Sequence, residues 1–129
     1  RAKYISWERL WTFSGGPFSN KGWPKVNSHT DEEFAQRWGL KTGIASATQF
    51  MGYVIQLMID LFGVDFLSHG TMEVKIIGNV NAGDTVVAKA VVTSREVKDN
   101  TVSLGMDIWV EDETGRKALV GSAQYRHAA

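Results

Sequence analysis

The sequence predicts an α+β domain in which an antiparallel sheet wraps around one long apolar helix. The first observation is residues 43–62, where apolar side chains recur at the three- and four-residue spacing of a helix. Asp60 is the only charged residue in that segment, so we expect the helix to be buried on nearly all sides. The second observation is the stretch after residue 70, where β-branched segments with two-residue alternation are separated by turn residues.

Length and composition are those of one globular domain. The 129 residues fit a single domain over 1–129, with 43% hydrophobic and 22% charged residues. The 14 basic residues balance the 14 acidic ones, so the charge indicates neither a nucleic-acid partner nor an anionic membrane surface. No apolar run reaches the roughly 18 residues of a membrane span, and the first residues lack a signal-peptide core.

Several chemistries are excluded by missing residue types. The sequence has no cysteine, which rules out disulfides, thiolate metal sites and a cysteine nucleophile, and fits a reducing compartment. Its 3 histidines lack the spacing of a metal motif, and no glycine-rich phosphate motif is present. We therefore expect a cytoplasmic protein without a metal ion or a cofactor.

The second half of the chain predicts four long strands. They cover residues 71–78, 85–97, 101–112 and 116–127, with turns at 81–84, 98–100 and 113–115. Short connections favour antiparallel neighbours, and residues 3–5 can add another strand. A sheet curled around a single helix is the hotdog arrangement. Its open edges predict a homodimer or a higher homo-oligomer.

The remaining elements are short. Ser6 is expected to cap a helix over 7–13, and residues 14–28 read as a loop. Thr30 is expected to cap a helix over 31–38, with Glu33 completing a capping box. Gly63 is the expected end of the long helix.

The candidate chemistry lies around His29, Asn27 and the start of the long helix. A helix N-terminus offers free N–H groups that can stabilise an enolate oxygen, and a histidine can move a proton near neutral pH. A lone histidine before a helix is also commonly structural, and the spacing leaves both possibilities open. His69 is expected in the loop before the first long strand, and His127 in a frayed terminus.

Three segments resemble the MaoC-like dehydratases, the (R)-specific enoyl-CoA hydratase branch of the hotdog superfamily. NSHTDEEFAQRWGL is similar to the family's hydratase motif, GIASATQFMGYVIQLMIDLFG to the start of its helix, and TMEVKIIGNVNAGDTVVAKAVVTS to its strand–turn–strand segment. The resemblance implies addition or removal of water across the double bond of an enoyl thioester, usually on coenzyme A.

The resemblance also assigns residues. His29 matches the catalytic histidine, and Ala47 takes the place of the glycine whose N–H binds the thioester carbonyl, with Ser46 and Thr48 beside it. The family's motif is D-x-N-P-x-H, and neither alignment register supplies its aspartate. Pro24 stands there in one register and Lys25 in the other; the second register aligns Asn27 with the motif asparagine.

Three functions follow from this pattern. The first is a hydratase or dehydratase with His29 as acid/base and Asn27 as a water orienter. The second is another acid/base reaction on the same scaffold, such as an elimination, isomerisation or cyclisation. The third is a non-catalytic thioester-binding subunit. A hotdog thioesterase fits less well, because Asp60, the only carboxylate of the long helix, lies near its far end.

Aromatic residues crowd the N-terminal segment. Trp7, Trp11, Phe13, Phe18 and Trp23 fall within the first 23 residues. They pack a short helix on the sheet in one interpretation. In the other they line an apolar substrate pocket, with Trp23 as a binding residue. Trp38 and Trp109 are expected in the core or at an interface.

Overall fold

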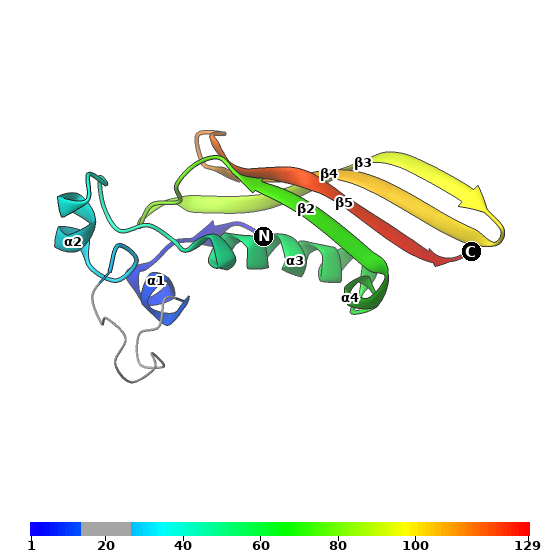
Figure 1. The fold of residues 1–129 in the computed structure, drawn as a ribbon, viewed down its shortest axis with the longest axis horizontal. Coiled ribbons are helices and arrows are strands. Elements are labelled where there is room, and N and C mark those ends of the chain that lie inside the picture. Colours follow the sequence, from blue (N-terminus) through cyan, green and yellow to red (C-terminus); the bar gives the residue numbers. More distant parts are fainter. Residues whose placement is uncertain (14–26) are drawn as a thin grey trace.

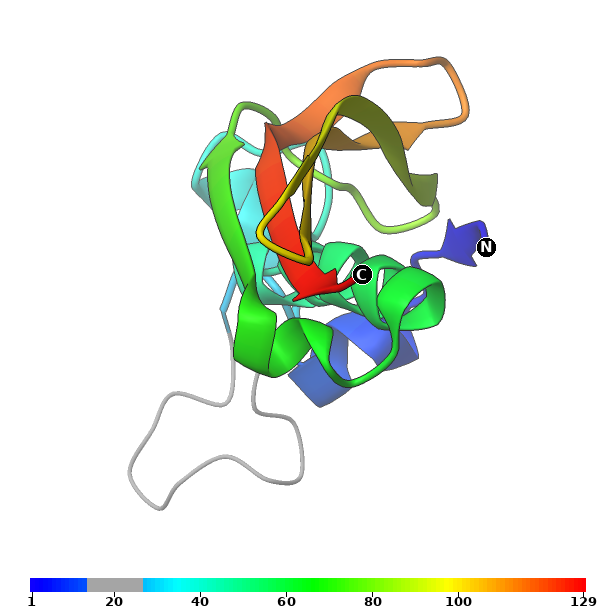
Figure 2. The same ribbon diagram turned by 90° about the vertical axis from the view of Figure 1, so that its right-hand side faces the viewer.

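The computed structural model describes residues 1–13 and 27–129. Its strands are β1 (Lys3–Tyr4), β2 (Gly70–Ile76), β3 (Thr85–Lys98), β4 (Thr101–Asp112) and β5 (Lys117–Ala128). Its helices are α1 (Trp7–Phe13), α2 (Glu32–Arg37), α3 (Ala47–Phe62) and α4 (Phe66–His69). The predicted α+β hotdog architecture is confirmed: a curled antiparallel sheet covers α3 (Figures 1 and 2).

The sheet has the strand order β1-β3-β4-β5-β2. The β3–β4–β5 part is the predicted meander, and the β3–β4 turn consists of Asp99 and Asn100, both with positive φ (53° and 59°). Two positive-φ residues are what a tight hairpin turn requires. Strand β2 pairs with β5 along its whole length rather than with β3, which follows it in the chain. The β3–β4 hairpin extends beyond the C-terminal end of α3 (Figure 1).

The core lies between α3 and the concave face of the sheet. Helix α3 contributes the apolar residues Phe50, Val54 and Met58 and also buries the polar Gln49, and the sheet contributes Val86, Met106, Ile108, Val110, Leu119 and Ala123. Burial of this apolar stripe holds the helix in place, at about 25 cal/mol per Å² of apolar surface removed from water. Among the described residues, no helix combines the length and apolarity needed to cross a bilayer.

The long helix begins later than expected, at Ala47 instead of residue 43. The segment before it is extended because its backbone groups bond elsewhere. Ala45 N–H donates to the Val80 carbonyl over 2.8 Å, and Ala82 N–H donates to the Gly43 carbonyl over 2.8 Å. Gly63 ends the helix as predicted, with φ of 75°.

The cap of α2 was also predicted one residue too early. Asp31, not Thr30, is the N-cap, and its carboxylate accepts a hydrogen bond from Phe34 N–H over 2.7 Å. The Thr30 hydroxyl instead accepts from Asn27 N–H in the preceding turn. The Ser6 cap is confirmed, because its hydroxyl accepts from Arg9 N–H over 3.2 Å.

Two further expectations were wrong, and a third holds only in part. His127 is not frayed: it pairs with Val102 in the sheet and its ring stacks on Tyr125, with centroids 5.5 Å apart. His69 is the last residue of α4 rather than part of a loop. Trp38 is 74% exposed, which excludes the core, and its expected place at an interface stays a prediction.

Candidate active site

A tight turn places His29 immediately before α2. The Asn27 side-chain oxygen accepts from the backbone N–H of His29 over 2.8 Å. The Asn27 carbonyl accepts from the backbone N–H groups of Thr30 and Asp31, both over 3.1 Å. Asparagine favours such turns because its short side chain bonds the backbone two residues on. Asn27 therefore fixes the backbone that carries the imidazole.

The ring of His29 is tied to the segment that leads into α3. Its Nδ1 atom lies 2.8 Å from the carbonyl oxygen of Ile44, and Ile44 N–H donates to the Ser28 carbonyl over 3.0 Å. A carbonyl oxygen only accepts, so Nδ1 carries the hydrogen. In the neutral ring this leaves the lone pair on Nε2, which is the atom able to take a proton. The side chain is half-buried, between solvent and core.

Helix α3 begins at Ala47, three residues after Ile44. Ser46 is its N-cap by backbone conformation but makes no side-chain cap bond. The Ser46 hydroxyl instead lies 3.1 Å from the hydroxyl of Thr48. The first N–H groups of a helix have no acceptor within the helix and carry part of its dipole. Ala47 and Thr48, which own these groups, are exposed at the surface.

The structure thus brings five of the predicted site residues to one region. Asn27 and His29 come from the turn before α2, and Ser46, Ala47 and Thr48 from the start of α3. Trp23, like Phe18, Pro24 and Lys25, lies outside the described residues. Within the described residues, no carboxylate bonds the His29 ring, since the nearby Asp31 caps α2.

Sequence reasoning missed the backbone partners of this region. Ile44, assigned to the helix, is the residue that orients His29, and it also bridges Asn81 in the loop before β3. Ser46 is a residue type that favours N-caps, and this signal could have placed the helix start correctly.

Helix α1 packs beside the same segment. A Cβ atom built on Gly43 would lie 2.3 Å from the Trp7 ring, so the indole rests directly on the Gly43 backbone. Trp7 and Trp11, one turn apart on α1, remain 39% and 44% exposed. The predicted aromatic surface is therefore partly open rather than fully used in packing.

A second group of titratable residues lies at the opposite end of α3. Tyr125 donates to Asp65 over 2.6 Å, and the Asp65 carboxylate lies 3.0 Å from His69 Nδ1. The hydrogen bond from Tyr125 lowers the pKa of Asp65, with a smaller contribution from His69, and the same bond raises the pKa of Tyr125. No group of three or more His, Asp or Glu residues in ranges 1–13 and 27–129 is placed to hold a metal ion.

The fold is shared with solved hydratases and dehydratases. It superposes on a MaoC-like dehydratase from Rhodospirillum rubrum with a TM-score of 0.74 and 13% identity, covering 99% of this chain and 87% of that one. For an (R)-hydratase from Pseudomonas aeruginosa the TM-score is 0.71 and the identity 17%, covering 100% and 81%. For a chain of the ChsH1–ChsH2 complex from Mycobacterium tuberculosis the TM-score is 0.74 and the identity 14%, and the match covers 100% of this chain and 92% of that one.

These neighbours confirm the hotdog fold and its resemblance to MaoC-like dehydratases and (R)-hydratases. No family model and no curated protein matches the sequence. At 13–17% identity the likeness concerns the fold, and the assignment of chemistry depends on the site itself.

Proposed function

We propose that the chain is a hydratase or dehydratase that acts on an enoyl or β-hydroxyacyl thioester. The observation that carries the proposal is the bond from His29 Nδ1 to the Ile44 carbonyl, two residues before the N-cap of α3. The bond leaves Nε2 as the basic atom of the ring. It also ties the His29 side chain to the segment that leads into the N-terminus of α3. A base and an oxyanion donor held on one rigid scaffold are what water addition to an unsaturated thioester requires.

In the hydration direction, His29 Nε2 takes a proton from water as the water oxygen bonds the β-carbon. The electrons of the double bond move onto the thioester oxygen, and the Ala47 N–H stabilises the resulting enolate. The α-carbon then takes the proton back from His29, so the sum is one water added. Dehydration is the reverse sequence. Asn27 holds the His29 backbone through its side-chain oxygen, and its amide nitrogen is assigned to orient the water.

Ser46 and Thr48 are proposed as substrate contacts beside Ala47, and Trp23 as a wall of the acyl pocket. The exposed rings of Trp7 and Trp11 support an apolar surface near the helix start. An aromatic lining favours a hydrophobic or ring-bearing acyl group over a short linear one.

The chain has no carboxylate at the position of the family's motif aspartate, and this supports a second candidate. Pro24 or Lys25 stands there, and no described carboxylate reaches the His29 ring. One base and one oxyanion donor suffice for an isomerisation or an elimination that does not activate water. A thioester-binding subunit without activity is the remaining alternative.

Product analysis separates these candidates. Wild-type protein is incubated with a panel of 2-enoyl-CoA thioesters in D2O, and the products are followed by proton NMR. The proposal expects a 3-hydroxyacyl thioester with one deuterium at the α-carbon. Isomerised substrate without added water would favour the second candidate. Unchanged substrate across the panel, with bound thioester detected, would favour the binding subunit.

We further propose that two copies associate through β3. Strand β1 pairs only with Thr85 and Val86 of β3, which continues to Lys98 with an outer edge that has no partner in the described chain. Val91, Val92 and Val97 on this stretch are about half exposed, with fractions of 49%, 55% and 54%. A long apolar edge of this kind is usually covered by another strand. A cytoplasmic location is part of the proposal and is supported by the absence of cysteine.

A further inference from the structure

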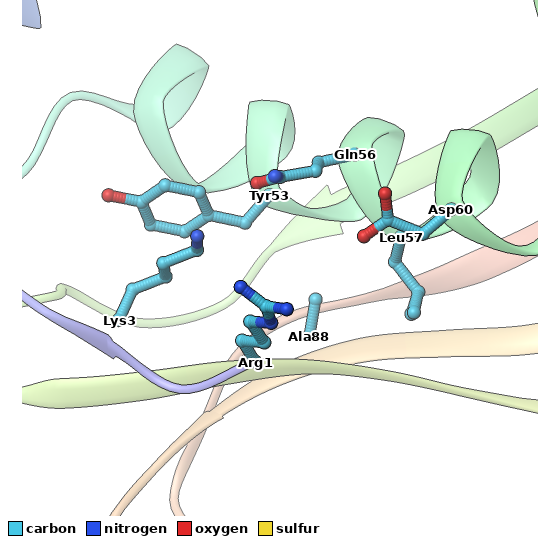
Figure 3. A pocket seen from close by; sticks show the side chains of 7 residues that line it. All are labelled: Arg1, Lys3, Tyr53, Gln56, Leu57, Asp60 and Ala88. Atoms are coloured by element: carbon cyan, nitrogen blue, oxygen red, sulfur yellow. The ribbon is translucent and has the colours of Figure 1, made fainter. Parts of the chain in front are cut away.

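A polar pocket lies between α3 and the N-terminal strand, away from the His29 turn. It encloses about 300 Å³ and is lined by Arg1, Lys3, Tyr53, Gln56, Leu57, Asp60 and Ala88. Figure 3 shows the side chains of Arg1 and Lys3 reaching from the strand side toward the face of α3 that carries Tyr53, Gln56 and Asp60. None of these residues takes part in the proposed hydration step.

Among the described residues, neither of the pocket's two cations has an ion-pair partner. Ion pairs in the described part of the chain involve Arg37, His69, Lys89 and Arg116, and neither Arg1 nor Lys3 is among them. Asp60 is the acidic residue of the pocket, two helical turns beyond Tyr53, and the Lys3 amine lies at the Tyr53 end (Figure 3). The Tyr53 end of the pocket therefore has excess positive charge.

The Tyr53 hydroxyl is hydrogen-bonded to a buried side chain, that of Gln49. Gln49 has 0% exposure, and its amide nitrogen donates to the Tyr53 hydroxyl oxygen over 2.9 Å. The hydroxyl hydrogen is then available to another acceptor. The side-chain oxygen of Gln49 is buried without a hydrogen-bond partner in the described residues. Native proteins seldom leave such an atom unpaired, because doing so costs about 1–3 kcal/mol. This oxygen is an acceptor and so contributes nothing to anion binding, but the bond from Gln49 fixes the hydroxyl of Tyr53, a residue that lines the pocket.

We propose that this pocket binds an anionic group of the substrate, a carboxylate or a phosphate, through Lys3, Arg1 and the Tyr53 hydroxyl. The proposal rests on the proposed function for the identity of the molecule that carries the anion. At about 1.5 Å of rise per residue, Tyr53 lies roughly 9 Å along α3 from Ala47 and Asp60 roughly 20 Å. Both the acyl chain and the carrier of an acyl thioester are long enough to reach from Ala47 to the pocket. The anion can therefore belong to the acyl group or to the carrier.

The test measures anion binding directly, without a catalytic readout. Glutarate and inorganic phosphate are titrated separately into the full chain, with 1,5-pentanediol as the uncharged counterpart of glutarate. Binding is followed by the chemical shifts of the backbone N–H groups of Lys3, Gln56 and Ala88. The variants are Lys3→Met and Tyr53→Phe, with Lys3→Arg as the charge-retaining variant. Matched controls are Lys75→Met on β2 and Tyr4→Phe, whose ring is 59% exposed.

We expect saturable shifts with at least one anion and none with the diol. Lys3→Met should weaken binding about tenfold, which is the size of a charge-assisted hydrogen bond, while Lys3→Arg and both controls retain it. Tighter binding of glutarate would assign the anion to the acyl group, and tighter binding of phosphate to the carrier. Shifts that do not saturate, or that Lys3→Met and Lys75→Met reduce equally, would overturn the proposal. Anion binding in a protein without hydratase activity would leave this site standing and remove the proposed reaction instead.

Discussion

The imidazole of His29 donates from Nδ1 to the carbonyl oxygen of Ile44 over 2.8 Å, and so links the turn before α2 to the start of α3. The two residues are 15 positions apart in the chain. The bond selects the tautomer with a basic Nε2, and it fixes the ring against the segment that carries the helix N-terminus. A side chain held in this way loses little further freedom when substrate binds.

Asn27 is expected to act through the backbone of His29. Asn27→Ala removes the acceptor of the His29 N–H and should lower kcat about tenfold, with a stability loss of about 1 kcal/mol. Asn27→Asp keeps the acceptor oxygen and should restore most of the stability. Steady-state kinetics and urea unfolding measure the two effects, with the exposed Asn79→Ala as the control. Equal behaviour of the Ala and Asp variants in unfolding would contradict the role of this hydrogen bond.

The contact between Trp7 and Gly43 predicts a steric effect. A Cβ on Gly43 would lie 2.3 Å from the indole, so Gly43→Ala should lower the free energy of unfolding by about 1–3 kcal/mol. Gly52 on α3 has open space around its Cβ position, and Gly52→Ala should stabilise the protein by up to about 1 kcal/mol. Urea unfolding measures both variants.

A double-mutant cycle checks the cause. Combining Gly43→Ala with Trp7→Ala removes the clash, so the added cost of the alanine should fall toward zero. The same cost in the presence and absence of the indole would show that the methyl group clashes with something else.

The bond between Tyr125 and Asp65 predicts a pH-dependent contribution to stability. Tyr125 lowers the pKa of Asp65 in the folded protein. The stability that this bond contributes is therefore present above the unfolded pKa of the carboxyl, near 4, and is lost as the pH falls through its folded pKa. Tyr125→Phe should therefore be destabilised most at pH 6–7, with a smaller difference from wild type at pH 2–3. Urea unfolding at both pH values measures this. Phenylalanine keeps the ring that stacks on Phe62, with centroids 4.6 Å apart, so an equal difference at both pH values would show that the hydroxyl does not act through the charge of Asp65.

The uncovered edge of β3 predicts a dimer that a charge disrupts. Val92→Lys places an ammonium group on the exposed edge and should convert a dimer into a folded monomer. Val64→Lys, at a 73% exposed position after α3, is the matched control and should leave the dimer intact. Light scattering after size-exclusion chromatography reads the mass. A wild-type monomer at micromolar concentration would contradict association through β3.

Most of the fold was predictable from local sequence patterns. The apolar period of 43–62 and the turn residues between the strands predicted α3 and the β3–β4–β5 meander, because burial and turn chemistry act over short distances. The pairing of β2 with β5 was not predictable in this way, since the chain passes from β2 at one edge of the sheet to β3 near the other edge before β5 returns to β2. The start of α3 was placed too early because Ala45 bonds to Val80, a contact far away in the chain.

Part of the candidate site was likewise predictable from the sequence, and part was not. The resemblance placed His29 near the start of the long helix, and the structure brings the two together through Ile44. The roles of Asn27 and His29 in a reaction stay predictions. The Gln49–Tyr53 couple was not foreseen, because a glutamine inside an apolar helical segment gives no sign of its partner until α3 is packed.

The most direct test of the account is the rate of loss of enone absorbance of a 2-enoyl-CoA thioester, measured for wild type, His29→Gln and His69→Gln. The account predicts that His29→Gln lowers kcat about 10²–10⁴-fold, as expected for loss of a general acid/base, and that His69→Gln retains the wild-type rate. Circular dichroism confirms that each variant is folded. A His29→Gln variant as active as wild type would contradict the assignment of His29 as the acid/base.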